Sequence, residues 1–168
     1  IVGKKKYIDA MKKNPLTRAF RIDKFTISAL EATFRLYLDE KEAIEKIPTL
    51  QMLTMEKAKL ENKAKILYNL IIENIECKDM KVEIVDDYSE VGGGSLPLEK
   101  LDTKCIKIGF EKMSVAEFEK HLRNYEVPII TRVYKDNVYI DLRTVAEDEF
   151  DTVVAGIIYG LNEVKGVH

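Results

Sequence analysis

The stretch Ile-Ile-Thr-Arg-Val-Tyr-Lys-Asp-Asn-Val-Tyr-Ile-Asp-Leu, residues 129–142, decides the fold of the second half of this 168-residue chain. Its two ends, 129–134 and 138–142, are rich in β-branched and aromatic side chains, and Lys135-Asp136-Asn137 separates them. This pattern predicts two strands joined as a hairpin. Because a hairpin pairs its strands antiparallel, we expect a mainly antiparallel sheet.

Elements on both sides of the hairpin complete a small domain, which we place at residues 79–168. Apolar residues at 82–85 and 105–110 predict two further strands. Ser114, with Glu117 three residues later, predicts the start of a helix that runs to about residue 125. Residues 147–164 predict a closing helix. The order strand, strand, helix, strand, strand, helix indicates an α+β domain whose helices cover one face of the sheet.

Residues 1–78 predict a helical arm with little core of its own. Short helices are expected at 5–13, ended by Asn14-Pro15, at 26–38 with an apolar stripe, and at 42–47, ended by Pro48. The longest helix is expected from Thr54, as its N-terminal cap, to Glu76. Its buried stripe would contain Leu60, Ala64, Leu67, Leu70, Ile71 and Ile75. A helical arm without a core fits a piece of something larger.

Composition excludes several classes of protein. No apolar run approaches the roughly 20 residues that span a bilayer, so we expect no membrane association. Cys77 and Cys105 have no C-x-x-C spacing, and His121 and His168 lie far apart in sequence, so we expect free thiols and no metal site.

Charge is distributed unevenly along the chain. Residues 1–24 contain eight Lys or Arg and two Asp, a net charge of +6, so residues 25–168 carry −8 of the total of −2. A basic arm on an acidic body suggests that the arm meets an anion, whether phosphate, nucleic acid or an acidic neighbouring subunit. A solvated basic helix is the alternative.

The densest polar cluster is Pro-Leu-Thr-Arg-Ala-Phe-Arg-Ile-Asp-Lys, residues 15–24. If the segment is helical, Arg18 and Arg21 lie on one face within reach of a single anion. Two guanidinium groups side by side suit a phosphate-like group, and Asp23 could orient one of them. The alternative is a pair of surface arginines that contact acidic neighbours.

Two further segments are candidates for anion binding. Gly92, Gly93, Gly94 and Ser95, within Val-Gly-Gly-Gly-Ser-Leu-Pro at 91–97, could form an anion nest of backbone amides, or a flexible linker between strands. Arg143, at the end of the second hairpin strand, could project into a cleft and bind a carboxylate or phosphate, or lie on the surface. Three adjacent lysines, Lys4 to Lys6, are expected to be solvated rather than to form a Schiff base.

Taken together, these segments resemble bacterial selenocysteine synthases, the L-seryl-tRNA(Sec) selenium transferases. The resemblance follows the chain in order through the stretches 1–5, 14–24, 29–33, 47–54, 91–97 and 141–145. The patterns N-P-L-x-R-A-x-R-x-D-K and V-G-G-G-S-L-P are its most specific parts.

The resemblance implies a fold-type I pyridoxal 5′-phosphate (PLP) enzyme of the cytoplasm, with an α/β family fold. Such enzymes convert serine-charged tRNA(Sec) to selenocysteinyl-tRNA(Sec) with selenophosphate, and they assemble as rings of dimers. Residues 1–78 would be the end of the large domain and connecting helices. The family's Schiff-base lysine precedes the position of Ile1, so the chain would contain no catalytic residue and be inactive alone.

The resemblance also assigns roles to the candidate residues. Arg18 and Arg21 match the arginine pair that binds selenophosphate, and Asp23 would support them. Arg143 occupies the place of a carboxylate-binding arginine in related enzymes. Residues 92–95 would shape the wall of the cleft.

Two other functions stay open at this point. The chain could be a tRNA-binding or oligomerisation module without activity of its own, in which the basic arm contacts the tRNA backbone. It could also be part of another fold-type I PLP enzyme that acts on a small amino acid or a sulfur substrate.

Overall fold

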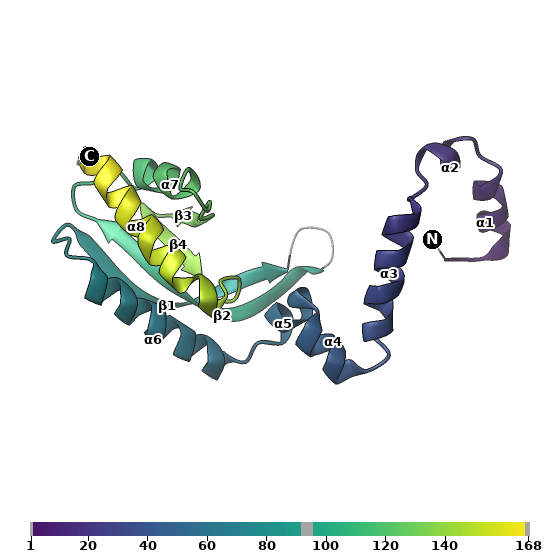
Figure 1. Cartoon of the computed structure of the whole chain (residues 1–168), viewed down its shortest axis with the longest axis horizontal. Helices are drawn as coiled ribbons and strands as arrows, with labels where there is room; N and C mark the ends of the chain where they lie inside the picture. The colour runs from purple at the N-terminus through teal and green to yellow at the C-terminus, as the bar shows by residue number, and fades with distance from the viewer. Residues whose placement is uncertain (1, 92–95, 167–168) are drawn as a thin grey trace. The chain divides into compact units, whose positions relative to one another are not determined.

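The computed structural model describes residues 2–91 and 96–166, and it divides into two compact units, residues 1–51 and 52–168 (Figure 1). Each unit is considered by itself.

A four-stranded antiparallel sheet forms the centre of the second unit. Its strands are β1 (Met80–Val91), β2 (Leu96–Phe110), β3 (Arg132–Tyr134) and β4 (Asn137–Asp141), in the order β1-β2-β4-β3. The long strands β1 and β2 pair from Met80 opposite Phe110 to Glu90 opposite Lys100, and the register shifts between Glu90 and Val91. The predicted mainly antiparallel sheet is thereby confirmed.

The hairpin predicted from residues 129–142 is present, with a tighter turn than expected. Lys135 and Asp136 have φ values of 46° and 56° and connect β3 to β4, while Asn137 already belongs to β4. Two consecutive left-handed residues form the turn whose twist matches that of paired strands, so this two-residue loop sets the β3–β4 register.

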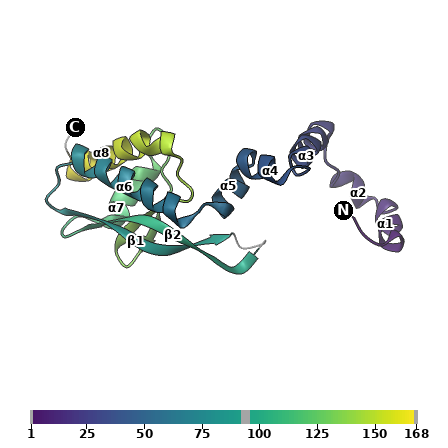
Figure 2. The ribbon, with the colours of Figure 1, turned by 90° about the horizontal axis from the view of Figure 1, so that it is seen from below.

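Three helices cover one face of this sheet: α6 (Lys57–Asn74), α7 (Val115–Arg123) and α8 (Phe150–Lys165) (Figure 2). Ser114 begins α7 as predicted, since its hydroxyl accepts a hydrogen bond from the Glu117 amide at 3.3 Å. A short 3₁₀ helix, Glu147–Glu149, precedes α8. The core lies between helices and sheet; its fully buried side chains include Leu60, Leu67, Ile71, Ile106, Ile108, Phe118, Leu122, Val138, Leu142 and Ile157.

The long helix differs from the prediction at its start and in the unit to which it belongs. Thr54 is the last residue of a separate helix, α5 (Pro48–Thr54), and α6 begins only at Lys57, with Glu56 at the N-cap position and no side-chain cap. Pro48 begins α5 rather than only ending the preceding helix, because proline is compatible with the first helical position. The apolar stripe of α6 packs on the sheet, so the second unit begins at Met52 rather than at residue 79.

The first unit contains α1 (Lys5–Lys12), α2 (Leu16–Ala19), α3 (Lys24–Leu36) and α4 (Glu40–Lys46), followed by the start of α5. Ala43 is the one buried side chain among its described residues 2–51. The predicted stripe of α3 is exposed: Ile27, Leu30 and Phe34 keep 52%, 47% and 61% of their surface. The prediction of little core, made for residues 1–78, holds for residues 2–51 but does not extend to α6, whose side chains Leu60, Leu67 and Ile71 are fully buried in the second unit. No described helix combines the length and apolar character that crossing a membrane requires.

Candidate functional site

All eight cationic side chains of residues 4–24 are exposed. Among the described residues, no salt bridge involves any of them. Cations in the rest of the chain are often paired, as in Lys104 with Asp86 at 2.9 Å and Lys107 with Glu83 at 2.7 Å. The basic segment therefore presents its net positive charge to solvent, with none of its cations in an ion pair with a described residue.

Arg18 and Arg21 do not share a helix face. The helix α2 is a single turn that ends at Ala19, and Phe20 (φ −97°, ψ 4°) leaves helical geometry, so Arg21 lies in the connection to α3. Asn14 promotes this short turn because its Oδ1 accepts a hydrogen bond from the Leu16 amide at 3.0 Å. The geometric basis of the predicted pair, helical i, i+3 spacing, is wrong, although both arginines are exposed close together in sequence.

Neither arginine has an acidic partner in the part of the chain that the structure describes. Asp23, the nearest carboxylate in sequence, caps α3 instead: Oδ1 accepts from the Thr26 amide at 2.8 Å and Oδ2 from the Thr26 hydroxyl at 3.2 Å. The hydrogen bond from the Thr26 amide lowers the pKa of Asp23. In this structure Asp23 holds the start of α3 rather than orienting an arginine.

Arg143 is buried and binds main-chain carbonyls, not an open cleft. Only 6% of its surface is exposed. Its Nη1 donates to the Met52 carbonyl at 2.6 Å, with a weaker contact to Met55 at 3.4 Å, and its Nη2 donates to the Asp102 carbonyl at 2.5 Å. Both the predicted anion contact and the surface alternative are therefore wrong for this chain. Arg143 instead ties the segment before α6 to β2 and to the end of β4.

A second buried cation, Lys63, was not predicted from the sequence. Lys63 is 3% exposed, and its Nζ donates to the Leu142 carbonyl at 2.7 Å and to the Val145 carbonyl. Burial lowers its pKa. The spacing in the sequence could have indicated this burial, since Lys63 lies three residues after Leu60 and four before Leu67 and so falls on the buried stripe of α6.

Polar groups also gather on the sheet face opposite the helices. Asp141 accepts hydrogen bonds from the Ser89 hydroxyl at 2.5 Å, the Thr103 hydroxyl at 2.6 Å and the Arg143 amide at 3.0 Å. Burial, together with nearby carboxylates, raises the pKa of the Cys105 thiol on this face to about 12. A protonated thiol and a carboxylate that already accepts three hydrogen bonds offer neither nucleophile nor base.

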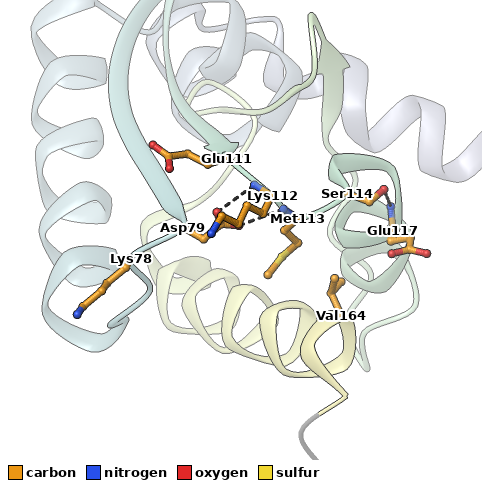
Figure 3. Close-up of a pocket in the computed structure, with 8 residues that line it drawn as sticks. All are labelled: Lys78, Asp79, Glu111, Lys112, Met113, Ser114, Glu117 and Val164. Carbon is orange, nitrogen blue, oxygen red and sulfur yellow. Dashed lines mark hydrogen bonds between the residues drawn. The ribbon is translucent and has the colours of Figure 1, made fainter.

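A surface hollow of about 680 Å³ lies between the start of β1 and the start of α7 (Figure 3). The Asp79 carboxylate accepts from the amides of Lys112 and Met113, each at 3.0 Å, and so fixes the turn after β2. Figure 3 shows Lys78 pointing away from these groups, toward solvent. The polar groups at the centre of the hollow serve the fold, so the hollow does not present a formed ligand site.

The glycine segment Gly92, Gly93, Gly94 and Ser95 lies outside the described residues. Its neighbours are known: Val91 ends β1, Leu96 begins β2, and the two residues pair with each other.

The described residues do not fit covalent binding of PLP. A Schiff-base lysine needs a reactive amine in a desolvated site. Lys63 is the one buried lysine in the described part of the chain, and two carbonyls already accept hydrogen bonds from its amine. Lys4, Lys5 and Lys6 are exposed, as predicted. Across residues 2–91 and 96–166, no three metal-ligating side chains converge.

Comparison with known proteins gives a consistent result. A family model described as L-seryl-tRNA selenium transferase matches residues 1–146. Proteins named L-seryl-tRNA(Sec) selenium transferase are similar along almost the whole chain: that of Alkaliphilus oremlandii is 53% identical over 92% of this chain and 32% of its own length. The Clostridium perfringens strain 13 protein is 51% identical over 91% of this chain and 33% of its own length. The Alkaliphilus metalliredigens protein is 48% identical over 94% of this chain and 33% of its own length. The chain thus spans about a third of the length of the curated relatives it matches.

Proposed function

The chain belongs to the L-seryl-tRNA selenium transferase family, and on that premise we propose that it is the C-terminal part of an enzyme that converts seryl-tRNA(Sec) to selenocysteinyl-tRNA(Sec) with selenophosphate. The observation that carries this proposal is identity of about half the residues over more than nine-tenths of the chain to proteins named for that transfer. It favours a tRNA substrate over a small amino acid.

The whole enzyme is proposed to use PLP and to work in the cytoplasm as a ring of dimers. Since no described lysine suits the cofactor, the Schiff-base lysine would come from the remainder of the protein. The second unit would be the small domain of a fold-type I enzyme, in which Arg143 and Lys63 are structural. The first unit, with its exposed α3 stripe, would complete its packing against the remainder of the protein or a neighbouring subunit.

Arg18 and Arg21 are the residues of this chain proposed to bind selenophosphate. Both guanidinium groups are exposed, and no carboxylate among the described residues competes for them. Planar guanidinium groups donate pairs of hydrogen bonds that match phosphate oxygens. Because the Asp23 carboxylate accepts hydrogen bonds from Thr26, it leaves the guanidinium donors of both arginines free for the anion.

The test uses the whole protein that contains this chain, with R18A, R21A and the control R123A, which removes an exposed arginine paired with Glu119. Transfer of radiolabelled selenium to seryl-tRNA(Sec) and the absorbance of bound cofactor are both measured. R18A and R21A should each lower kcat/KM for selenophosphate by about 10²-fold, with the cofactor band unchanged, because one charge-assisted donor contributes on that order. Wild-type transfer by both variants would refute the assignment, and loss of the cofactor band would point to a structural defect instead.

A further inference from the structure

We propose that the lysine-bearing side of α1 is a binding surface for the phosphate backbone of RNA, separate from the selenophosphate contact of Arg18 and Arg21. The choice of RNA over other polyanions rests on the proposed function. The surface itself rests on the geometry and charge of α1.

The lysines of α1 fall on one side of the helix. Lys5 and Lys12 are seven residues apart, as are Lys6 and Lys13, and seven residues make almost two full turns. Each pair is therefore aligned along the helix. Tyr7, Ile8 and Met11 occupy the other side, which accounts for the amphipathic pattern.

The lysine-bearing side of α1 has a net positive charge even when its acidic residue is included. Asp9 is its one acidic residue, three or four positions from each of the four lysines, and leaves a net charge of +3. None of the four lysines forms a salt bridge with any described residue. By contrast, lysines of the second unit such as Lys81 and Lys107 pair with glutamates at 2.7 Å.

The spacing selects a ligand with several anionic groups. Aligned lysines two turns apart are separated by about 10 Å along the helix axis, so one phosphate cannot contact both. A nucleic-acid backbone presents a series of phosphates and is attracted by such a row of cations without regard to sequence. A single small anion would gain nothing from the second lysine of each pair.

The test measures binding of an unacylated tRNA transcript to the whole protein that contains this chain by fluorescence anisotropy over a range of salt concentrations. The variant is K5Q/K12Q. The matched control, K59Q/K65Q, removes two exposed helical lysines of α6 that form no salt bridge with the described residues. We expect K5Q/K12Q to reduce the slope of log K against log salt by about 2, roughly 1 for each phosphate that a lysine no longer neutralises, and the control to leave it unchanged.

Several results would overturn the proposal. An unchanged salt slope for K5Q/K12Q, or equal effects of the two double variants, would do so. The proposal would also be overturned if inorganic phosphate displaced the tRNA more strongly than chloride does at equal ionic strength, since that result indicates a site for one small anion. If K5Q/K12Q instead reduced self-association in sedimentation velocity without affecting tRNA, the partner would be an acidic protein surface.

The assay involves neither selenium transfer nor the cofactor. Failure of the proposed function, read from R18A and R21A, therefore stays distinguishable from failure of this surface. All four substituted lysines are exposed, so the far-UV circular dichroism spectrum should be the same in wild type and variants, which provides the folding control.

Discussion

Replacing Arg143 by methionine should destabilise the second unit strongly, because the buried guanidinium group donates to main-chain carbonyls. The guanidinium makes two well-formed hydrogen bonds, to Met52 O at 2.6 Å and Asp102 O at 2.5 Å. A hydrogen bond from a charged donor contributes about 1.5–3 kcal/mol. Water can reach these carbonyls in part once the side chain is shortened, so we take the lower value for each and expect a loss of about 3 kcal/mol in the free energy of unfolding.

The assay is urea unfolding followed by far-UV circular dichroism, since the chain has no tryptophan. With an m value of about 1.5 kcal/mol/M, a loss of about 3 kcal/mol moves the midpoint down by about 2 M. The control is R123M, which breaks the i, i+4 pair between the exposed Arg123 and the largely buried side chain of Glu119 and should cost about 1 kcal/mol or less. If R143M costs no more than R123M, the buried guanidinium does not stabilise the fold, and its structural role is refuted.

Two further predictions concern buried titratable groups. K63M should cost about 2 kcal/mol by leaving the Leu142 and Val145 carbonyls without their donor. It should also remove a rise in stability with pH. Burial holds the pKa of Lys63 in the folded state below its ordinary 10.5, so the folded state releases this proton at a lower pH than the unfolded state does. The unfolding free energy of the wild type should therefore increase as the pH rises from the folded-state pKa toward 10.5. Parallel pH profiles of the two proteins in urea unfolding would contradict this. In a C77A variant, alkylation near pH 8 followed by peptide mapping should leave Cys105 unmodified until the chain is unfolded, because its pKa is about 12; rapid labelling of the folded protein would contradict it.

Local patterns predicted the second unit well. Alternation at 129–142 predicted the β3–β4 hairpin, and the apolar stripe from Leu60 to Ile75 predicted the buried side of α6. Both depend on side chains within a few residues of one another, where the period of a helix or strand decides which side is buried. The helix α2 was not predicted as a separate element, because a four-residue helix has no period to detect.

The candidate site was predictable only in part. Exposure of the basic segment follows from its composition, since a run of unpaired cations cannot be buried without a large desolvation cost. The functions of Arg18 and Arg21 depend on groups outside this chain and so remain proposals. Asp23 illustrates the limit: a carboxylate two residues after Arg21 could pair with it or cap the next helix, and the capping contact with Thr26 is the one that forms.

The sequence by itself determined the helices α1, α3 and α4, the antiparallel hairpin and the positive charge of residues 4–24, because each of these arises from near neighbours along the chain. Only the tertiary structure decided that Arg143 and Lys63 are buried and which carbonyl groups they bind. The carbonyl that Arg143 binds at Met52 is 91 residues away, and the one that Lys63 binds at Leu142 is 79 residues away. A main-chain carbonyl is the same at every position, so no residue type marks it as a partner, and a buried cation finds it only when the packed helices and strands bring the two together.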